Sequence, residues 1–319
     1  MCGVSLLAAT AFSSASTAAS DYPARPIRIV VSQQAGGGTD TIARLWAESV
    51  GKTLGTSVVV ENRPGAGGSI AAQSVLSQPA DGYTLFLAGV SQMVLNKFVY
   101  KPLAYSPEND FVGIGMLTTV PFALVANPKT GLKTLDDLRA ASKAKPDHLT
   151  FASSGNGNST HLVVEMLMKQ TGMKLMHIPF KGEPDGLVST IGGTTDLMAP
   201  VVGSALPLIK QGKLTALLVF SDSRLPDLPN VPTAKEAGLT GFENIGWSAI
   251  AAKKGTPSEA IEKLNHATQI FLADPTVVKK LSEAQVQPMP GPASALQQMI
   301  VQDTKKWEEA IGDLNLAVN

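Results

Sequence analysis

Two stretches of the chain share one pattern: IVVSQQAGGGTD at residues 29–40 and LTFASSGNGNST at residues 149–160. Each has a short apolar run and a loop rich in glycine and small polar residues. A segment with apolar residues at helical spacing follows. This order predicts a strand, a tight connection and a helix. Because the same order returns about 120 residues later, the two stretches are interpreted as equivalent elements of two related lobes.

The same alternation extends along the chain in both directions. The predicted strands cover residues 27–31, 57–61, 83–87, 149–152, 176–179, 196–199, 214–220 and 247–251. The predicted helices cover residues 39–54, 69–76, 134–143, 159–171, 184–191, 205–211, 257–272, 275–284 and 292–311, and the Pro-rich stretch 225–232 is a connector. Strands that alternate with helices predict an α/β protein with parallel-type sheets covered on both faces.

The composition excludes several classes of protein. The chain has 319 residues, of which 44% are hydrophobic and 16% charged, so it can bury a large core and is not disordered. Its 26 basic and 26 acidic residues give no net charge, whereas a nucleic-acid-binding protein normally needs a basic face. No nucleic-acid partner is therefore expected.

The first twenty residues have the composition of a signal peptide. An apolar run at residues 4–12 is followed by a stretch of Ser, Ala and Thr up to Ser20, which suits signal peptidase. No Lys or Arg precedes Arg25, so a truncated start or a disordered tail is the alternative. Cys2, the single cysteine, would leave with the signal, and no lipid anchor is predicted.

The two glycine-rich loops suit an anion better than a nucleotide. A helix N-terminus carries unpaired N–H groups and a partial positive charge, and neighbouring glycines let a ligand approach the backbone. Thr39 is expected to cap the first helix, and Ser159 or Thr160 the second. Neither loop matches a dinucleotide or phosphate-loop motif. Two such ends facing each other across a cleft would hold a small carboxylate; a simple tight connection is the alternative for each loop.

Residues for catalysis or metal binding are poorly represented. The four histidines are scattered, and only His161 lies beside a candidate loop. No metal-ligand spacing and no nucleophile-elbow motif occur. Asp40 is interpreted as a carboxylate that favours the helix dipole rather than as an acid–base group, and Lys181 as added charge in the cleft or a solvated lysine. We expect no catalytic residues, no metal and no cofactor.

Six segments together resemble one family. They are YPARPI at 22–27, GGGTD at 36–40, VVENRPGAGG at 59–68, DGYTL at 81–85, ASSGNGNSTH at 152–161 and VPTAKEAG at 231–238. The sequence is similar to the solute-binding receptors of tripartite tricarboxylate transporters, the Bug-type periplasmic proteins. The similarity covers essentially everything after residue 20.

The resemblance implies a two-lobed periplasmic-binding-protein fold of the Venus-flytrap, type II-like kind, with a ligand cleft between the lobes. Residues 21–121 and 222–319 would form the first lobe and residues 122–221 the second, with the signal peptide at residues 1–20. The C-terminal helices would thus return to the first lobe. The implied role is that of a monomeric, non-enzymatic periplasmic receptor that delivers a small carboxylate to the subunits of a membrane permease. A dicarboxylate, an aromatic carboxylate and an acidic amino acid all remain open as ligands.

The family's binding loops can be carried over to this chain, with two departures. Where the family usually has Pro-Phe-x-Pro-Gly-Gly, residues 32–37 read SQQAGG, so Gln33 replaces a ring. Residues 199–201 read APV where the family often has Phe-Asp-Asn, which makes that wall apolar. The candidate ligand-binding residues are Gln33, Gln34, Gly37, Gly38, Thr39, Asp40, Ser91, Ser154, Asn156, Asn158, Ser159, Thr160, His161, Lys181 and Gly182.

Two other functions remain as alternatives. The same scaffold could report a ligand to a membrane sensor kinase, which the sequence does not separate from transport. An α/β enzyme acting on an organic acid would need a pair of acid–base groups in the cleft, and no convincing pair is visible.

Overall fold

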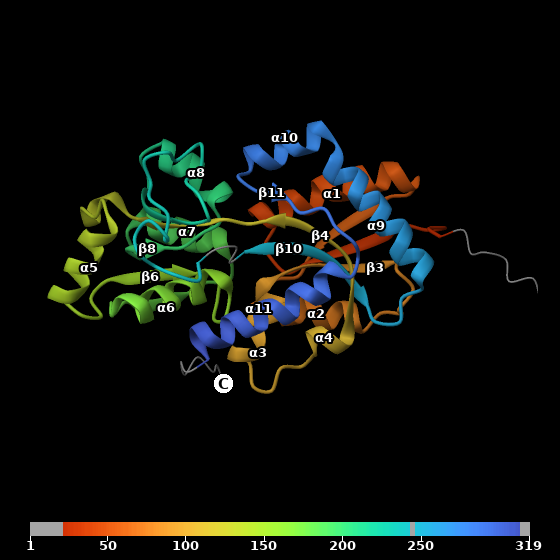
Figure 1. Ribbon diagram of the computed structural model, residues 1–319, viewed down its shortest axis with the longest axis horizontal. Coiled ribbons are helices and arrows are strands. Elements are labelled where there is room, and N and C mark those ends of the chain that lie inside the picture. Colours follow the sequence, from red (N-terminus) through yellow and green to blue (C-terminus); the bar gives the residue numbers. More distant parts are fainter. Residues whose placement is uncertain (1–21, 243–245, 313–319) are drawn as a thin grey trace, which may run out of the picture.

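The computed structural model describes residues 22–242 and 246–312 and contains two lobes, each built around one β-sheet (Figure 1). The first sheet has the strand order β11-β4-β10-β3-β1-β2, and the second has the order β7-β6-β8-β5-β9. The strands of the first sheet are β1 (Ile27–Val31), β2 (Val58–Asn62), β3 (Thr84–Gly89), β4 (Phe111–Thr119), β10 (Trp247–Lys253) and β11 (Gln287–Pro288). Those of the second are β5 (Phe122–Ala126), β6 (Thr150–Ser153), β7 (Met176–Pro179), β8 (Leu197–Met198) and β9 (Thr215–Phe220).

Helices cover both sheets, as Figure 1 shows. The first lobe carries α1 (Gly38–Leu54), η1 (Ala66–Gly68), α2 (Ser69–Leu76), η2 (Ser91–Leu95), α3 (Asn96–Val99), α4 (Pro107–Asp110), α9 (Ser258–Ala273), α10 (Pro275–Glu283) and α11 (Ala295–Ile311). The second carries η3 (Pro128–Thr130), α5 (Leu135–Ala144), α6 (Ser159–Thr171), α7 (Glu183–Gly192) and α8 (Val202–Lys210). The predicted bounds of β1, β7, α2 and α6 are confirmed. The N-terminal segment predicted to be a signal peptide lies outside the described residues.

The alternating side chains of β1 explain why the first sheet is covered on both faces. Ile27, Ile29 and Val31 pack with Trp46 of α1 in one apolar cluster, while Val30 packs in another cluster with residues of α2 and α11. Successive side chains of a strand point to opposite faces, so a run of apolar residues needs a helix layer on each side.

The prediction of parallel sheets is wrong for part of each sheet. Strand β1 pairs in parallel with β2 and β3, but β10 is antiparallel to both β3 and β4. In the second sheet β5 is antiparallel to β8 and β9. Strands β5 and β10 follow the crossings between lobes, where the chain enters a sheet from the other lobe instead of returning through a helix, and the short β11 is also antiparallel to β4.

Two strands that the sequence analysis missed carry the chain from one lobe to the other. Strand β4 ends at Thr119 and β5 begins at Phe122, so only Val120 and Pro121 lie between the two sheets. The amide of Val120 donates to the carbonyl of Gly246 at 2.8 Å, which ties this crossing to the chain that enters β10. A Cβ atom at Gly246 would lie 2.2 Å from the Val120 carbonyl oxygen, so only glycine allows this approach.

The segment after β9 remains against the second lobe for about twenty residues. Phe242 stacks on Phe220 with ring centroids 5.1 Å apart, and Val219 forms a bridge with Thr233. The lobe boundaries near residues 121 and 221 stay predictions.

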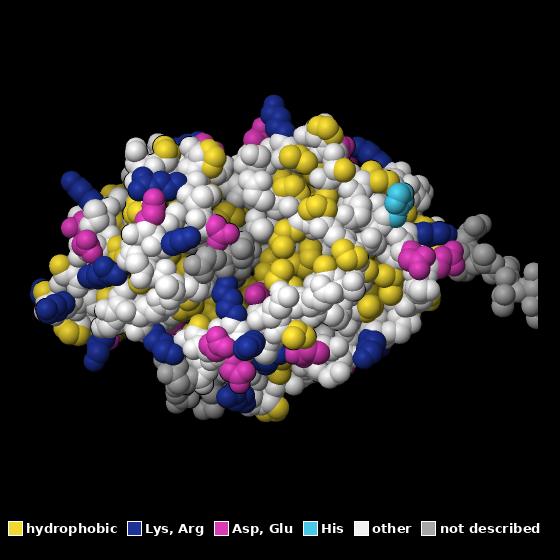
Figure 2. All heavy atoms as spheres, viewed as in Figure 1, with side chains coloured by type: hydrophobic (Ala, Val, Ile, Leu, Met, Phe, Trp, Pro, Cys, Tyr) yellow, Lys and Arg dark blue, Asp and Glu magenta, His cyan; other side chains and the backbone are white. Residues whose placement is uncertain are grey.

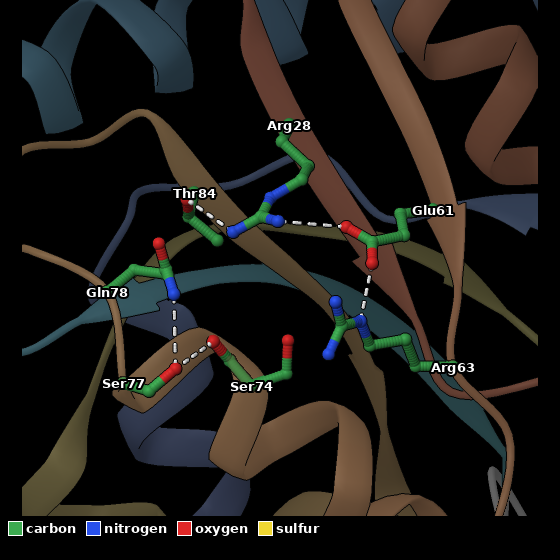
Figure 3. Close-up of polar contacts among 7 residues, drawn as sticks. All are labelled: Arg28, Glu61, Arg63, Ser74, Ser77, Gln78 and Thr84. Atoms are coloured by element: carbon green, nitrogen blue, oxygen red, sulfur yellow. Dashed lines mark hydrogen bonds and ion pairs between the residues drawn. The ribbon is translucent and has the colours of Figure 1, made fainter.

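Charged residues of the 59–68 motif form cross-strand contacts on the first sheet (Figure 3). Arg28 of β1 donates to Glu61 of β2 at 3.0 Å and to Thr84 of β3 at 3.4 Å, and Glu61 also binds Arg63. Arg28 and Glu61 are half-buried and Arg63 is exposed, so the pairs add modest stability and help to hold the strand register. This part of the motif is structural.

The predicted capping box of α5 is confirmed. The hydroxyl of Thr134 accepts from the amide of Asp137, and the Asp137 carboxylate accepts in return from the amide of Thr134. Asp thus replaces the usual Glu at this position without loss of the reciprocal bonds.

Candidate ligand-binding cleft

A cavity lies between the two lobes and is lined by both glycine-rich loops. Ten of the fifteen candidate residues line it: Gln33, Gln34, Gly37, Gly38, Thr39, Ser91, Ser154, Asn158, Ser159 and Thr160. The other lining residues, which the sequence analysis did not select, are Leu87, Ala88, Gly89, Val90, Gln92, Val120, Phe122, Glu183, Pro184, Val201, Gly246, Trp247 and Ser248. The two loops that share a sequence pattern therefore meet at one cavity.

Helix α1 presents unpaired backbone amides to this cavity. The helix begins at Gly38, and Gly37 is its N-cap, with no side-chain cap bond. The expectation that Thr39 caps the helix is wrong, because Thr39 already lies inside the first turn. Among the described residues, no acceptor receives the amides of Gly38 or Thr39, whereas Thr41 donates to the Gly37 carbonyl at 3.1 Å. Such an end attracts an anion through its N–H groups and the helix dipole.

Asp40 does not line the cavity but holds the first loop in place. Its Oδ2 atom accepts from the Gly36 amide at 3.0 Å and from Arg44 Nε at 2.9 Å, and its Oδ1 atom accepts from Asn62 at 2.9 Å. Burial raises the pKa of Asp40, but the bonds from Arg44, Gly36 and Asn62 outweigh it and keep that pKa below its ordinary value. The carboxylate is thus fully used within the first lobe.

The N-terminus of α6 differs, because protein groups already satisfy its first amides. The side chain of Asn158 accepts from the Thr160 amide at 3.2 Å, so Asn158 is the cap and the prediction of Ser159 or Thr160 is wrong. The Ser159 amide donates to Ser91 Oγ of the first lobe at 3.0 Å. Since Asn, Ser and Thr all serve as caps, the local sequence did not distinguish them. The two similar loops therefore offer different groups to a ligand.

Side chains from both lobes also meet at the cleft's edge. Gln34 donates to Asp185 at 3.3 Å, and a Cβ atom at Gly182 would lie 2.8 Å from Gln34 Oε1. Tyr100 donates to the Asn156 carbonyl at 2.9 Å. Asn156, Lys181 and Gly182 do not line the cavity itself but line a neighbouring groove. This groove shares Gln33, Gln92, Ser154 and Asn158 with the cavity.

His161 is buried beneath the second loop and does not line the cavity. Its Nδ1 atom accepts from the Gly157 amide at 3.2 Å, and its Nε2 atom lies 3.2 Å from Glu165 Oε1. Its ring stacks on that of His177 with centroids 3.8 Å apart. Burial, together with the proximity of His161, lowers the pKa of His177 to about 3. The Nε2 atom of His177 lies 2.6 Å from Ser153 Oγ, so the pair supports the loop.

Glu183 is the most important cavity residue that the sequence analysis missed. It is the first residue of α7, and its Oε2 atom accepts from the Val201 amide at 2.9 Å. Burial raises its pKa. The sequence pattern predicts a helix that starts at residue 184 and, in this segment, added charge from Lys181, so it does not single out Glu183.

No cluster of three or more His, Cys, Asp or Glu side chains in the described ranges could hold a metal ion.

Within the described ranges no helix is long and apolar enough to cross a membrane. Basic and acidic side chains are both spread over the face in Figure 2.

Two α/β lobes joined by a double crossing, with a cavity lined from both sides, define the periplasmic-binding-protein fold. The model of the tripartite tricarboxylate transporter family receptor matches residues 42–316. The chain belongs to this family of periplasmic solute-binding receptors, as the sequence resemblance predicted.

Known relatives match over nearly the full chain. Protein BugT of Bordetella pertussis is 34% identical over 305 residues, which cover 95% of this chain and 94% of BugT. An R. palustris protein solved with adipate superimposes with a TM-score of 0.88 at 31% identity, covering 92% of this chain and 98% of that one. MatC from Rhodopseudomonas palustris with bound malate gives a TM-score of 0.86 at 31% identity, covering 91% of this chain and 99% of that one.

Proposed function

We propose that this chain captures a small carboxylate in the cavity between its lobes and delivers it to a membrane permease of the tripartite tricarboxylate type. The observation that carries the proposal is the pair of unpaired amides at Gly38 and Thr39, which end at a cavity lined by both lobes. A carboxylate there gains charge-assisted hydrogen bonds and the field of the α1 dipole. The similar proteins with adipate and malate support a ligand of this class.

The first loop would bind the carboxylate, and the second would complete the cavity wall. Gln33 adds an amide side chain on the α1 side, and Thr39 adds a hydroxyl group. Ser154, Ser159 and Thr160 contribute hydroxyl groups from the other lobe. The protein would catalyse no reaction; it would bind a ligand in the periplasm and release it unchanged.

The test is a thermal-shift and calorimetry panel on the chain from residue 21 onward. It compares carboxylic acids with their amides, and the bound ligand is recovered and analysed afterwards. A ligand present at a concentration of 100 times its dissociation constant adds about 2.7 kcal/mol to the free energy of unfolding, which raises the melting temperature by several degrees. A shift with acids and not with amides, with the ligand recovered unchanged, supports the proposal. Equal shifts with both, or a chemically altered ligand, would contradict it.

Delivery needs a separate experiment. The permease subunits are reconstituted in vesicles, and uptake of the labelled ligand is measured with and without the receptor. Uptake that requires the receptor supports a transport role. A ligand that binds the receptor but is not taken up would favour the sensing alternative.

A further inference from the structure

Among the described residues, the cavity wall has one ionisable side chain, and that side chain is acidic. Among the described residues that line the cavity, Glu183 alone carries a carboxyl group, and none is Lys, Arg or His. Asp40 faces its own loop and Lys181 lines the neighbouring groove. Helices α1, α6, α7 and α8 all begin at this wall, and among its described side chains a ligand meets one carboxyl group.

The carboxyl group of Glu183 is fixed in the wall by its own lobe. It accepts from the Val201 amide at 2.9 Å and from the hydroxyl of Ser204, both at the start of α8. Its neighbours in the wall include Pro184 and Val201, which are apolar. Because apolar surroundings screen charge poorly, a charged group of the ligand placed here interacts strongly with Glu183.

A second carboxylate on the ligand would be disfavoured at this wall. Two carboxylates in one site repel each other unless one of them binds a proton. Burial already raises the pKa of Glu183, and a second negative charge would raise it further. An ammonium group has the opposite effect, since it favours the ionised carboxylate and gives it a hydrogen-bond donor.

We propose that Glu183 is a specificity-determining residue, and that the ligand is a zwitterion whose carboxylate binds at the α1 N-terminus and whose ammonium group pairs with Glu183. This inference rests on the proposed function, because it takes the carboxylate seat at α1 as given. It narrows the ligand class from carboxylates in general to amino acids and similar compounds.

The experiment uses compounds of matched length that differ only in the far group. The pairs are 4-aminobutanoate with succinate, 5-aminopentanoate with glutarate, and 6-aminohexanoate with adipate; glutamate is tested beside glutarate for an α-ammonium group. Calorimetry on the native chain should show binding of at least one amino compound and binding about tenfold or more weaker for its diacid partner.

Glu183→Gln is the decisive variant. Its amide oxygen can still accept from Val201, so the wall is retained while the charge is removed. We expect it to weaken binding of the amino compound by about tenfold or more and to narrow the difference from the diacid. Asp136→Asn on α5 of the same lobe is the matched control, because it also removes one negative charge but its side chain is 86% exposed and lies outside the cavity wall, and it should change binding less than about twofold. The melting temperature of each ligand-free variant checks that it is folded.

The outcomes separate the inference from the function on which it rests. Binding of diacids in preference to amino compounds, or unchanged discrimination in Glu183→Gln, overturns the inference and leaves a carboxylate receptor. Absence of binding by every carboxylate in both panels overturns the proposed function, and the inference is overturned with it.

Discussion

Replacing Gly38 by proline tests whether the end of α1 is the carboxylate seat. Gly38 is the first residue of the helix, a position that proline occupies readily, and the extended backbone of Gly37 suits the residue before a proline. The substitution removes the Gly38 N–H group and leaves the helix itself intact. The matched variant Gly38→Ala keeps the N–H group, and its Cβ would lie 3.5 Å from Ser204 Oγ and 3.8 Å from a Val201 methyl group, which are ordinary contacts.

The expected loss follows from the bond that proline deletes. A hydrogen bond to a charged group contributes about 1.5–3 kcal/mol, so Gly38→Pro should weaken carboxylate binding by roughly 10- to 150-fold. Gly38→Ala should stay within about threefold of the native chain, a change of less than about 1 kcal/mol. Calorimetry gives both dissociation constants, and thermal unfolding without ligand checks the fold. Equal affinity in the proline and native chains would refute the reasoning, as would equal losses in the proline and alanine variants.

Three further predictions concern stability. Ser91→Ala removes the acceptor of the buried Ser159 amide and should lower the free energy of unfolding by about 1–3 kcal/mol in urea titration, whereas Ser77→Ala, with an exposed hydroxyl, should cost less than about 0.5 kcal/mol. Gly246→Ala forces a Cβ to within 2.2 Å of the Val120 carbonyl and should cost about 1–3 kcal/mol or more, while Gly192→Ala, which has open space around it, should be near neutral. The pKa of His177 is about 3 in the folded state and about 6.5 in the unfolded state, so between these pH values only the unfolded chain takes up the proton. The contribution of His177 to the free energy of unfolding is therefore complete above pH 6.5 and is lost as the pH falls below it. Between pH 7.5 and 5 the native chain should lose about 1 kcal/mol through this partly exposed ring after allowance for solvent screening, and His177→Gln should lose correspondingly less in unfolding titrations at both pH values.

Local sequence patterns predicted the strands that are followed directly by a helix, together with those helices. Apolar runs and helical spacing located β1, α1, β6 and α6, because these elements are specified by residues close to one another in the chain. Strand β4 was missed: Gly113 and Gly115 interrupt its apolar run, and the sequence offers no helix after it. Its place in the sheet depends on β10, whose residues lie more than 120 positions away.

The candidate site was predictable to the level of loops rather than of single bonds. The loop glycines and hydroxyls led to the cavity, but three adjacent residues, Asn158, Ser159 and Thr160, could each cap α6. Glu183 became visible only when the fold brought Val201 and Ser204 beside it. Long-range contacts of this kind leave no periodic signal in the sequence.

The difference between the two helix ends bears on how a ligand would favour the closed arrangement of the lobes. Ser91 with Ser159, and Gln34 with Asp185, already connect the lobes through protein groups alone. A ligand shifts a conformational equilibrium only through contacts that it makes in one state and not in the other. The amides of α1 belong to the first lobe and Glu183 to the second, so a ligand that used both would bridge the two lobes. A molecule that reached only α1 would bind both states with similar contacts. Bridging between α1 and Glu183, rather than binding to α1 alone, would therefore couple recognition of the ligand's far end to closure.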